Sequence, residues 1–250
     1  MSLVFRHAIV VGASSGIGAE IARQLAEDGC SVALLGRREA ELAAVAAGIN
    51  AGGRSRAIVA THDVTATDSV PALLDQLVKD LGGLDLLVYT AGIMHLPVEG
   101  EYDFMRDRAQ IEVNLLGAMA WMTPVAAMFE ARRTGTIVGI SSMAGERGRR
   151  SFPGYSTSKA GLTAWLEALR NRVSRHGVNV VTAKPGTVDT AMSANAPRRP
   201  MLVSASRAAA IILSAAKRGR SASVFVPGQW GLVALILRNL PSFIFRRLDL

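Results

Sequence analysis

A glycine-rich turn after the first apolar run is the feature that most limits how this chain can fold. The run Ala8–Val11 leads directly into Gly12-Ala13-Ser14-Ser15-Gly16-Ile17-Gly18, where a helical pattern begins. Glycines permit a tight reversal of the backbone and a close approach of the helix that follows. The N–H groups and partial positive charge at a helix start attract phosphate. The segment predicts a pyrophosphate-binding strand, turn and helix; the alternative is a tight turn without a ligand.

Short apolar runs alternate with longer helical patterns along the chain, which at 250 residues suits one domain. The runs are bounded by glycine or polar residues, as strands buried on both faces of a parallel sheet are. They are Ala8–Val11, Val32–Leu35, Ala57–Ala60, Leu84–Tyr89, Thr136–Ile140, Val178–Ala183 and Val224–Val226. Helical patterns cover Gly16–Asp28, Ala40–Ala51, Val70–Leu81, 109–131 and 155–176. This order predicts a single doubly wound α/β domain of the Rossmann type over residues 1–228, with a seven-stranded parallel sheet and helices on both faces.

The composition narrows the class of protein. The formal charge is +8, which is compatible with a polyanion partner, but the basic residues form no long block, so we expect no nucleic-acid partner. The single cysteine, Cys30, excludes an intrachain disulfide. The four histidines stand apart from any spaced ligand set, so we expect no metal. Residues 8–11 run straight into the glycine turn, so we expect no signal peptide and a cytoplasmic protein.

The second predicted strand ends in two arginines where an NAD site usually has an acid. Val32–Leu35 is followed by Gly36-Arg37-Arg38, and the first carboxylate is that of Glu39. An acid at this point bonds the ribose 2′-hydroxyl of NAD, whereas arginines grip a 2′-phosphate. Ser14 or Ser15 can add a hydroxyl to that phosphate. The segment predicts NADP; the alternative is that Arg37 and Arg38 are a solvated helix start.

Three polar residues in the second half of the chain can move a proton. Ser142 follows the run Thr136–Ile140, and Tyr155 and Lys159 come later at the spacing of one helical turn. That spacing puts the ammonium on the face of the phenol, where its charge, together with that of an oxidised nicotinamide, should lower the pKa of Tyr155 below its usual value of about 10. We expect Tyr155 to act as general acid in reduction and base in oxidation, and Ser142 to bond the carbonyl oxygen. The alternative is an exposed helical pair without chemistry.

Together these features resemble the short-chain dehydrogenase/reductase family, and the resemblance covers nearly the whole chain. Three residues depart from the family pattern. Val11 stands where the family has a threonine, and Tyr89-Thr90 replaces its two asparagines. The matches to the family's glycine turn, its adenine-contacting Asp-Val and its Ala-Gly are Gly12, Gly16, Gly18, Asp63, Val64, Ala91 and Gly92.

The resemblance implies hydride transfer between a nicotinamide and a carbonyl or secondary alcohol. It assigns catalysis to Asn114, Ser142, Tyr155 and Lys159, with Asn114 holding a helix kink and a proton-relaying water. It also gives Lys159 a bond to the nicotinamide ribose. It places a Pro-Gly segment, Pro185-Gly186-Thr187-Val188-Asp189-Thr190, beside the nicotinamide. The full set of expected cofactor residues is Gly12, Ser14, Ser15, Gly16, Ile17, Gly18, Arg37, Arg38, Asp63, Val64, Ala91, Gly92, Tyr155, Lys159, Pro185, Gly186, Val188 and Thr190.

We expect the substrate to lie against residues 93–103, 143–154 and 187–203. The methionines of the third segment, Met192 and Met201, favour an adaptable apolar pocket and hence a lipid-like or steroid-like ketone. One alternative is a 3-oxoacyl reductase that receives a carrier protein on arginines, namely Arg132, Arg133, Arg172 and Arg175. Another is a non-catalytic NADP-binding regulator, against which the complete catalytic set argues.

Residues 229–250 continue beyond the last predicted strand as an apolar tail. Leu232, Leu235 and Ile236 share a helical face before Pro241, and the tail ends near the basic pair Arg246-Arg247. The apolar pieces are shorter than the ~20 residues that span a bilayer, so we expect the tail to pack on the domain, on a partner subunit or on a membrane surface.

The two longest helical patterns carry apolar or small residues on more than one face. A helix that covers a sheet needs only one apolar stripe. The patterns over 109–131 and 155–176 therefore predict a homodimer or homotetramer built through these helices.

Overall fold

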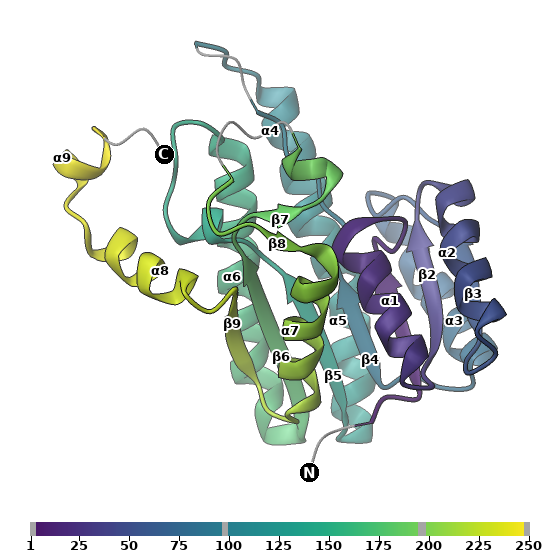
Figure 1. Ribbon diagram of the computed structural model, residues 1–250. Coiled ribbons are helices and arrows are strands. Elements are labelled where there is room, and N and C mark those ends of the chain that lie inside the picture. Colours follow the sequence, from purple (N-terminus) through teal and green to yellow (C-terminus); the bar gives the residue numbers. More distant parts are fainter. Residues whose placement is uncertain (1–3, 97–99, 195–198, 248–250) are drawn as a thin grey trace.

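A seven-stranded parallel sheet with helices on both faces forms the body of the protein (Figure 1). The computed structural model describes residues 4–96, 100–194 and 199–247. The sheet order is β3-β2-β1-β4-β5-β6-β9, which reverses direction between β1 and β4. The strands are β1 His7–Val11, β2 Ser31–Gly36, β3 Ala57–Thr61, β4 Leu86–Tyr89, β5 Gly135–Ile140, β6 Val178–Pro185 and β9 Ala222–Val226. The predicted fold class is confirmed, and each predicted strand is present within a few residues of its expected bounds.

Alternating side chains of the strands build two apolar cores, one on each face of the sheet. Val10 and Val88 lie in one core, and their neighbours Ile9 and Leu87 lie in the other. The first core is covered by α1 Gly16–Glu27, α2 Glu39–Ala51 and α7 Ala205–Lys217. The second is covered by α3 Val70–Leu81, α5 Gly117–Arg132 and α6 Pro153–Val173. The helix α7 is additional to those named from the sequence.

The helix expected over 109–131 is divided into three pieces. These are α4 Phe104–Ile111, a π-helical turn η2 over Glu112–Leu116, and α5. A π-helical turn widens the helix locally and is frequent at functional sites. Asn114 lies in that turn and is fully buried.

One continuous helical stretch in the described part of the chain, Phe104–Arg132, is long and apolar enough to cross a bilayer by length and composition. Its large side chains Trp121, Met122 and Phe129 are completely buried in the second core. Core helices of globular domains share this composition, so we interpret this stretch as a core helix.

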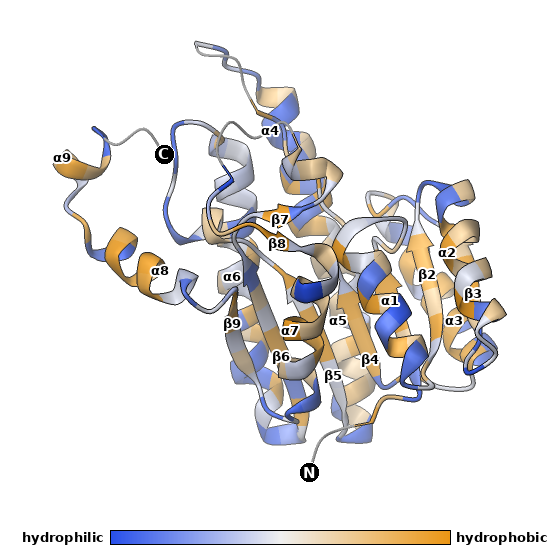
Figure 2. Ribbon diagram, in the orientation of Figure 1, coloured by the Kyte–Doolittle hydropathy of each residue, from blue (hydrophilic) through white to orange (hydrophobic). Residues whose placement is uncertain are grey.

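The end of the chain leaves the sheet as two short helices that project beyond β9 (Figure 1). They are α8 Trp230–Asn239 and α9 Ser242–Phe245, and Pro241 lies between them, as the sequence predicts. Figure 2 shows strongly apolar residues along α8 and on α9. A small two-stranded parallel sheet, β7 Val188–Asp189 with β8 Val203–Ser204, lies above the body and has no counterpart in the sequence analysis.

Most large side chains of α5 and α6 face the sheet, which weakens the original reason for expecting an oligomer. Trp121, Met122, Leu162 and Leu166 are fully buried within the chain itself. The outer face keeps Leu116, which is 47% exposed, and a row of small exposed residues. That row on α6 consists of Ala160, Ala164 and Ala168. Small residues still permit two helices to approach closely, so this face remains our predicted contact between copies.

We expect light scattering at micromolar concentration to show at least a dimer. The change Ala164→Arg puts a long charged side chain on the outer face of α6 and should lower the measured mass. The matched control is Ala47→Arg, at an exposed position of α2 on the opposite side of the sheet. A monomeric native protein would contradict the prediction.

Candidate active site

One cleft of about 1280 Å³ opens over the carboxyl ends of the parallel strands. Ligands of doubly wound folds bind at this edge, where the strand order reverses. In the described part of the chain, every predicted cofactor and catalytic residue except Asn114 lines the cleft. Sequence positions more than a hundred residues apart are thus gathered at one site, although their roles stay predictions.

The glycine turn forms a cradle that leaves no room for side chains. Gly12 and Gly16 adopt left-handed backbone conformations, with φ of +93° and +56°. A Cβ added to Gly18 would collide with the carbonyl oxygen of Gly12, and one added to Gly12 would lie 2.5 Å from the Ala91 nitrogen. The helix α1 begins here, so its first N–H groups lie at the cleft and suit a pyrophosphate.

Tyr89 and Thr90, two of the three departures from the family pattern, make contacts of their own. Thr90 Oγ1 donates to the carbonyl oxygens of Val11 (2.8 Å) and Gly12 (3.0 Å), which ties the end of β4 to the glycine turn. The hydroxyl of Tyr89 donates to the Val113 carbonyl at 2.7 Å and thereby joins β4 to the π-helical turn. Both substitutions therefore keep the centre of the sheet connected.

The two arginines after β2 have different surroundings. Arg38 donates to Ser14 Oγ at 2.7 Å and to Ser15 Oγ at 2.6 Å. Each arginine also lies 3.6 Å from a carboxylate, Arg37 from Asp63 and Arg38 from Glu41, but no serine hydroxyl accepts a hydrogen bond from Arg37 among the described residues. The pKa of Asp63 is lowered, chiefly by a hydrogen bond from the Thr65 backbone and further by the charge of Arg37. Arg38 with its two serines is therefore the cationic corner that suits a 2′-phosphate.

Tyr155 and Lys159 are buried on the first turns of α6, next to Ser142 at the end of β5. Burial raises the pKa of Tyr155, and a hydrogen bond with Ser142 opposes this only in part. Lys159 Nζ donates to the Ile140 carbonyl at 2.9 Å and lies 5.8 Å from the centre of the Tyr155 ring. Burial lowers the pKa of Lys159 to about 8.

In the protein alone, the pKa of Tyr155 is therefore raised, so the charge of Lys159 by itself does not produce the lowering expected from the sequence with an oxidised nicotinamide. Desolvation disfavours the phenolate, and the ammonium of Lys159 is directed to a backbone carbonyl. Tyr155 holds its proton at neutral pH, which suits the acid of a reduction.

Asn114 connects the π-helical turn to the loop after β4 and to α6. Its Oδ1 accepts from Ile93 N at 2.8 Å, and its Nδ2 donates to Ile93 O at 2.9 Å and to Ser158 Oγ at 3.0 Å. Ser158 in turn donates to the Tyr155 carbonyl at 2.8 Å. On the other side, Ser141 Oγ donates to the Lys159 carbonyl at 2.9 Å. The two serines brace the catalytic turn, a role that their sequence neighbours alone do not reveal.

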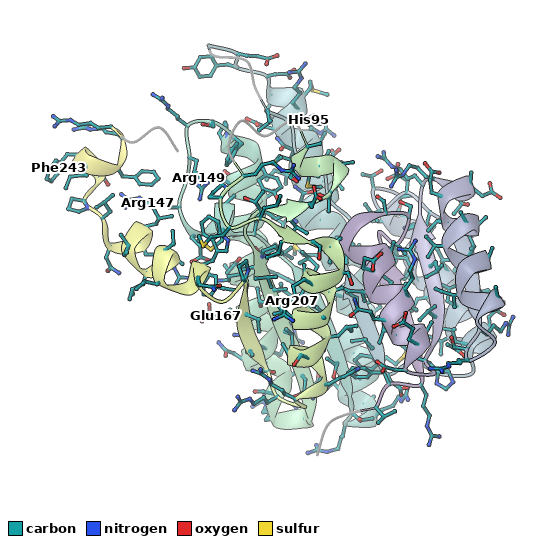
Figure 3. All side chains as sticks on the ribbon, in the orientation of Figure 1. His95, Arg147, Arg149, Glu167, Arg207 and Phe243 are labelled. Carbon is teal, nitrogen blue, oxygen red and sulfur yellow. The ribbon has the colours of Figure 1, made fainter. Side chains whose placement is uncertain are left out.

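Residues from all three predicted substrate segments line the cleft. Met94, Phe152 and Met192 give it apolar surface. Residues 97–99 and 195–198, including Pro197, lie outside the described residues. His95 is exposed and its ring is no part of this lining (Figure 3). Among residues 4–96, 100–194 and 199–247, no group of three or more His, Cys, Asp or Glu could hold a metal.

The first residue of the tail also reaches the cleft. Trp230 lines it and packs directly on Gly186, where an added Cβ would collide with the indole nitrogen. Trp230 clusters with Met143, Ala234 and Leu237, so the inner face of α8 packs on its own domain. From the sequence, Trp230 is expected only as part of the apolar tail. The missing side chain at Gly186 is the one sequence signal for this contact.

Two adjacent residues on the loop after Ser142 hold the tail, and we call them the tail latch: Glu146 and Arg147. The side chain of Glu146 is 1% exposed; it lies 2.8 Å from Lys184 Nζ and pairs with Arg238 of α8. Arg147 donates to the carbonyls of Leu237 (2.6 Å) and Leu240 at the end of α8 (Figure 3).

Arg147 also lies 4.2 Å from the ring centre of Phe245. Its guanidinium satisfies carbonyls that have no partner within the helix and complements the helix dipole. Arg147, expected from the sequence in a substrate segment, is therefore a tail contact instead.

The sequence model of the short chain dehydrogenase family matches residues 6–200. The match includes the glycine cradle, Asn114, Ser142, Tyr155, Lys159 and the Pro-Gly segment. The chain belongs to the short-chain dehydrogenase/reductase family. The match over residues 6–200 confirms the predicted family. Members of this family are oxidoreductases that use a nicotinamide cofactor.

Relatives of this short-chain dehydrogenase/reductase extend over most of its length. An uncharacterised oxidoreductase of Myxococcus xanthus is 34% identical over 243 residues, covering 96% of this chain and 95% of the relative. The ketoacyl reductase HetN of Nostoc is 34% identical over 200 residues, covering 77% and 69%. An alcohol dehydrogenase of Thermococcus sibiricus, solved with 5-hydroxy-NADP, superposes with a TM-score of 0.79 over 88% of this chain and 95% of its own. At 24% identity that likeness shows the fold alone.

Arg147→Met should release the tail while the sheet stays folded. Each hydrogen bond from a charged group contributes about 1.5–3 kcal/mol, so losing two should open α8 more often. We expect faster amide hydrogen exchange over 230–245 and a loss of turnover, because Trp230 leaves the cleft wall. Arg172→Met, at an exposed position of α6, is the matched control. Unchanged exchange over the tail would contradict the assigned role.

Proposed function

We propose that this protein is an NADP-dependent oxidoreductase that interconverts a carbonyl and a secondary alcohol on an apolar, lipid-like or steroid-like substrate. One observation carries the proposal. The glycine cradle, the Arg38 corner and the buried proton donor Tyr155 line a single cleft. A cofactor held by the glycine cradle and the Arg38 corner would run along the carboxyl edge of the sheet towards Tyr155.

The residues fit the expected cofactor in three places. The phosphates would lie on Gly12, Gly16, Ile17 and Gly18 at the start of α1, and the adenine on Asp63 and Val64. The nicotinamide end would lie among residues that line the opposite part of the cleft, namely Ala91, Gly92, Lys159, Pro185, Gly186, Val188 and Thr190. When bound, the cofactor supplies or accepts the hydride.

The chain itself moves the proton. In reduction, the carbonyl carbon would receive the hydride that the cofactor supplies, and the hydroxyl of Tyr155 gives its proton to the carbonyl oxygen as the double bond becomes a single bond; oxidation reverses both transfers. Ser142 hydrogen-bonds the same oxygen as negative charge develops on it. Lys159 is buried beside the Tyr155 ring in the cleft wall. Its positive charge would stabilise the tyrosinate that remains after proton transfer.

The preference for NADP is supported by the corner after β2. Arg38 already has its guanidinium between two hydroxyls, so a 2′-phosphate would receive one cation and two polar groups. Both arginines have a carboxylate 3.6 Å away, so the two serine hydroxyls distinguish Arg38 from Arg37 as the principal contact in this corner.

The apolar substrate is supported by Met94, Phe152, Met192 and Trp230 in the cleft wall. The similarity to the ketoacyl reductase HetN favours a second candidate, a 3-oxoacyl substrate on a carrier protein. A non-catalytic regulator would not require the complete buried catalytic set. We place the protein in the cytoplasm.

We expect tighter binding of NADPH than of NADH, and Arg38→Ala should remove most of the difference. Losing a charge-assisted hydrogen bond costs about 1.5–3 kcal/mol, so the Kd for NADPH should rise roughly 10- to 100-fold. The Kd for NADH should stay nearly constant. Arg37→Ala is the matched comparison and should have the smaller effect. Fluorescence titration gives all six constants, and tighter NADH binding by the native protein would overturn the preference.

Tyr155→Phe should reduce turnover about 100- to 10,000-fold, since it removes the acid/base hydroxyl and keeps the ring. NADPH oxidation over a graded series of ketones measures the rate, and NADPH fluorescence should show a nearly unchanged Kd. Lys159→Met should impair both rate and Kd. The control is Thr157→Val, at an exposed position of the same helix turn. Near-native rates in the phenylalanine variant would exclude Tyr155 as the proton donor.

A further inference from the structure

The outer face of the tail is apolar and uncovered. We call it the tail patch: Leu232, Leu235 and Ile236 on α8 with Phe243 and Ile244 on α9, whose side chains are 38–66% exposed. From this face we propose that the protein docks on an anionic lipid surface through its tail patch. The proposal goes beyond the oxidoreductase activity and does not depend on it.

The inner face of α8 accounts for only half of its apolar residues. Trp230, Ala234 and Leu237 are buried on the domain, and the tail latch fixes the helix in that orientation. Val233 is partly buried against the same cluster, and Leu232, Leu235 and Ile236 are therefore held outward by contacts on the other side of the helix. Figure 3 shows Phe243 at the outer end of the tail, away from the cleft. A fixed apolar face of this kind needs an apolar partner.

The charge beside the tail patch selects the partner. Residues 229–250 carry three arginines and one acid, Asp249, and Arg246 and Arg247 are exposed beside Phe243 and Ile244. The third arginine, Arg238, pairs with the buried Glu146. Apolar side chains next to a net positive charge match the apolar interior and negative headgroups of an anionic membrane.

A second copy of the chain fits the same surface poorly. Two copies that met through their tail patches would bring two tails of net positive charge together. Like charges repel, so this contact is opposed electrostatically. An anionic lipid surface meets the apolar and the charged residues at once, so we assign it as the occupant.

Docking in this orientation would bring the cleft close to the membrane. The helix α8 begins at Trp230 in the cleft wall and carries the tail patch along its length. A lipid-like ketone leaving the bilayer beside α8 would therefore have a short path to Tyr155. This link to the substrate rests on the proposed function, whereas docking does not.

Vesicle sedimentation with the full chain tests the proposal. We expect the native protein to sediment with vesicles of phosphatidylcholine mixed with phosphatidylglycerol and to stay in solution with phosphatidylcholine alone. The double change Leu235→Ser and Ile236→Ser should lower the bound fraction at least tenfold. The double change Arg246→Gln and Arg247→Gln should lower it by roughly fivefold for each charge removed. The controls are Met105→Ser and Arg172→Gln, which alter an exposed methionine and an exposed arginine elsewhere.

Circular dichroism and NADPH binding show whether the variants remain folded. Binding that is equal in native protein and both double variants would overturn the proposal. A native protein that does not bind anionic vesicles would also overturn it. If in that case the Leu235/Ile236 variant has a lower mass than the native protein in light scattering, the tail patch joins two copies. Vesicle binding without turnover of any ketone would sink the proposed function and leave the docking surface standing.

Discussion

The close approach of backbone segments at the centre of the sheet is the constraint on which the site depends. Gly12 and Gly18 touch because neither has a side chain, and Thr90 fastens β4 to the same turn. Since the strand order reverses between β1 and β4, this contact occurs where the cleft must open. The cofactor cradle and the start of α1 follow from this one crowded contact.

Burial controls the chemistry around Tyr155. A phenol removed from water keeps its proton, and an ammonium removed from water is more easily neutralised. Both effects act in the described protein, since burial raises the pKa of Tyr155 and lowers that of Lys159 to about 8. Serines on either side, Ser141 and Ser158, hold the turn that carries both residues, so the proposed proton donor, Tyr155, is positioned by hydrogen bonds from these two serines.

The tail makes the active site depend on residues beyond the last strand. Glu146 and Arg147 follow closely after Ser142, and both bind α8. The same helix supplies Trp230 to the cleft and presents the tail patch outward. A movement of the tail would therefore reach the catalytic loop through short, direct contacts.

The sequence by itself determined the sheet, the glycine cradle and the Tyr155–Lys159 pair, because periodicity and short motifs are local along the chain. It could not divide the roles of Arg37 and Arg38, since Asp63 and the serines come from other strands. It could not place Trp230 on Gly186, nor Arg147 on α8, because such contacts join residues far apart in sequence. Only tertiary packing, which decides what each long side chain can reach and how far it is desolvated, assigned these partners.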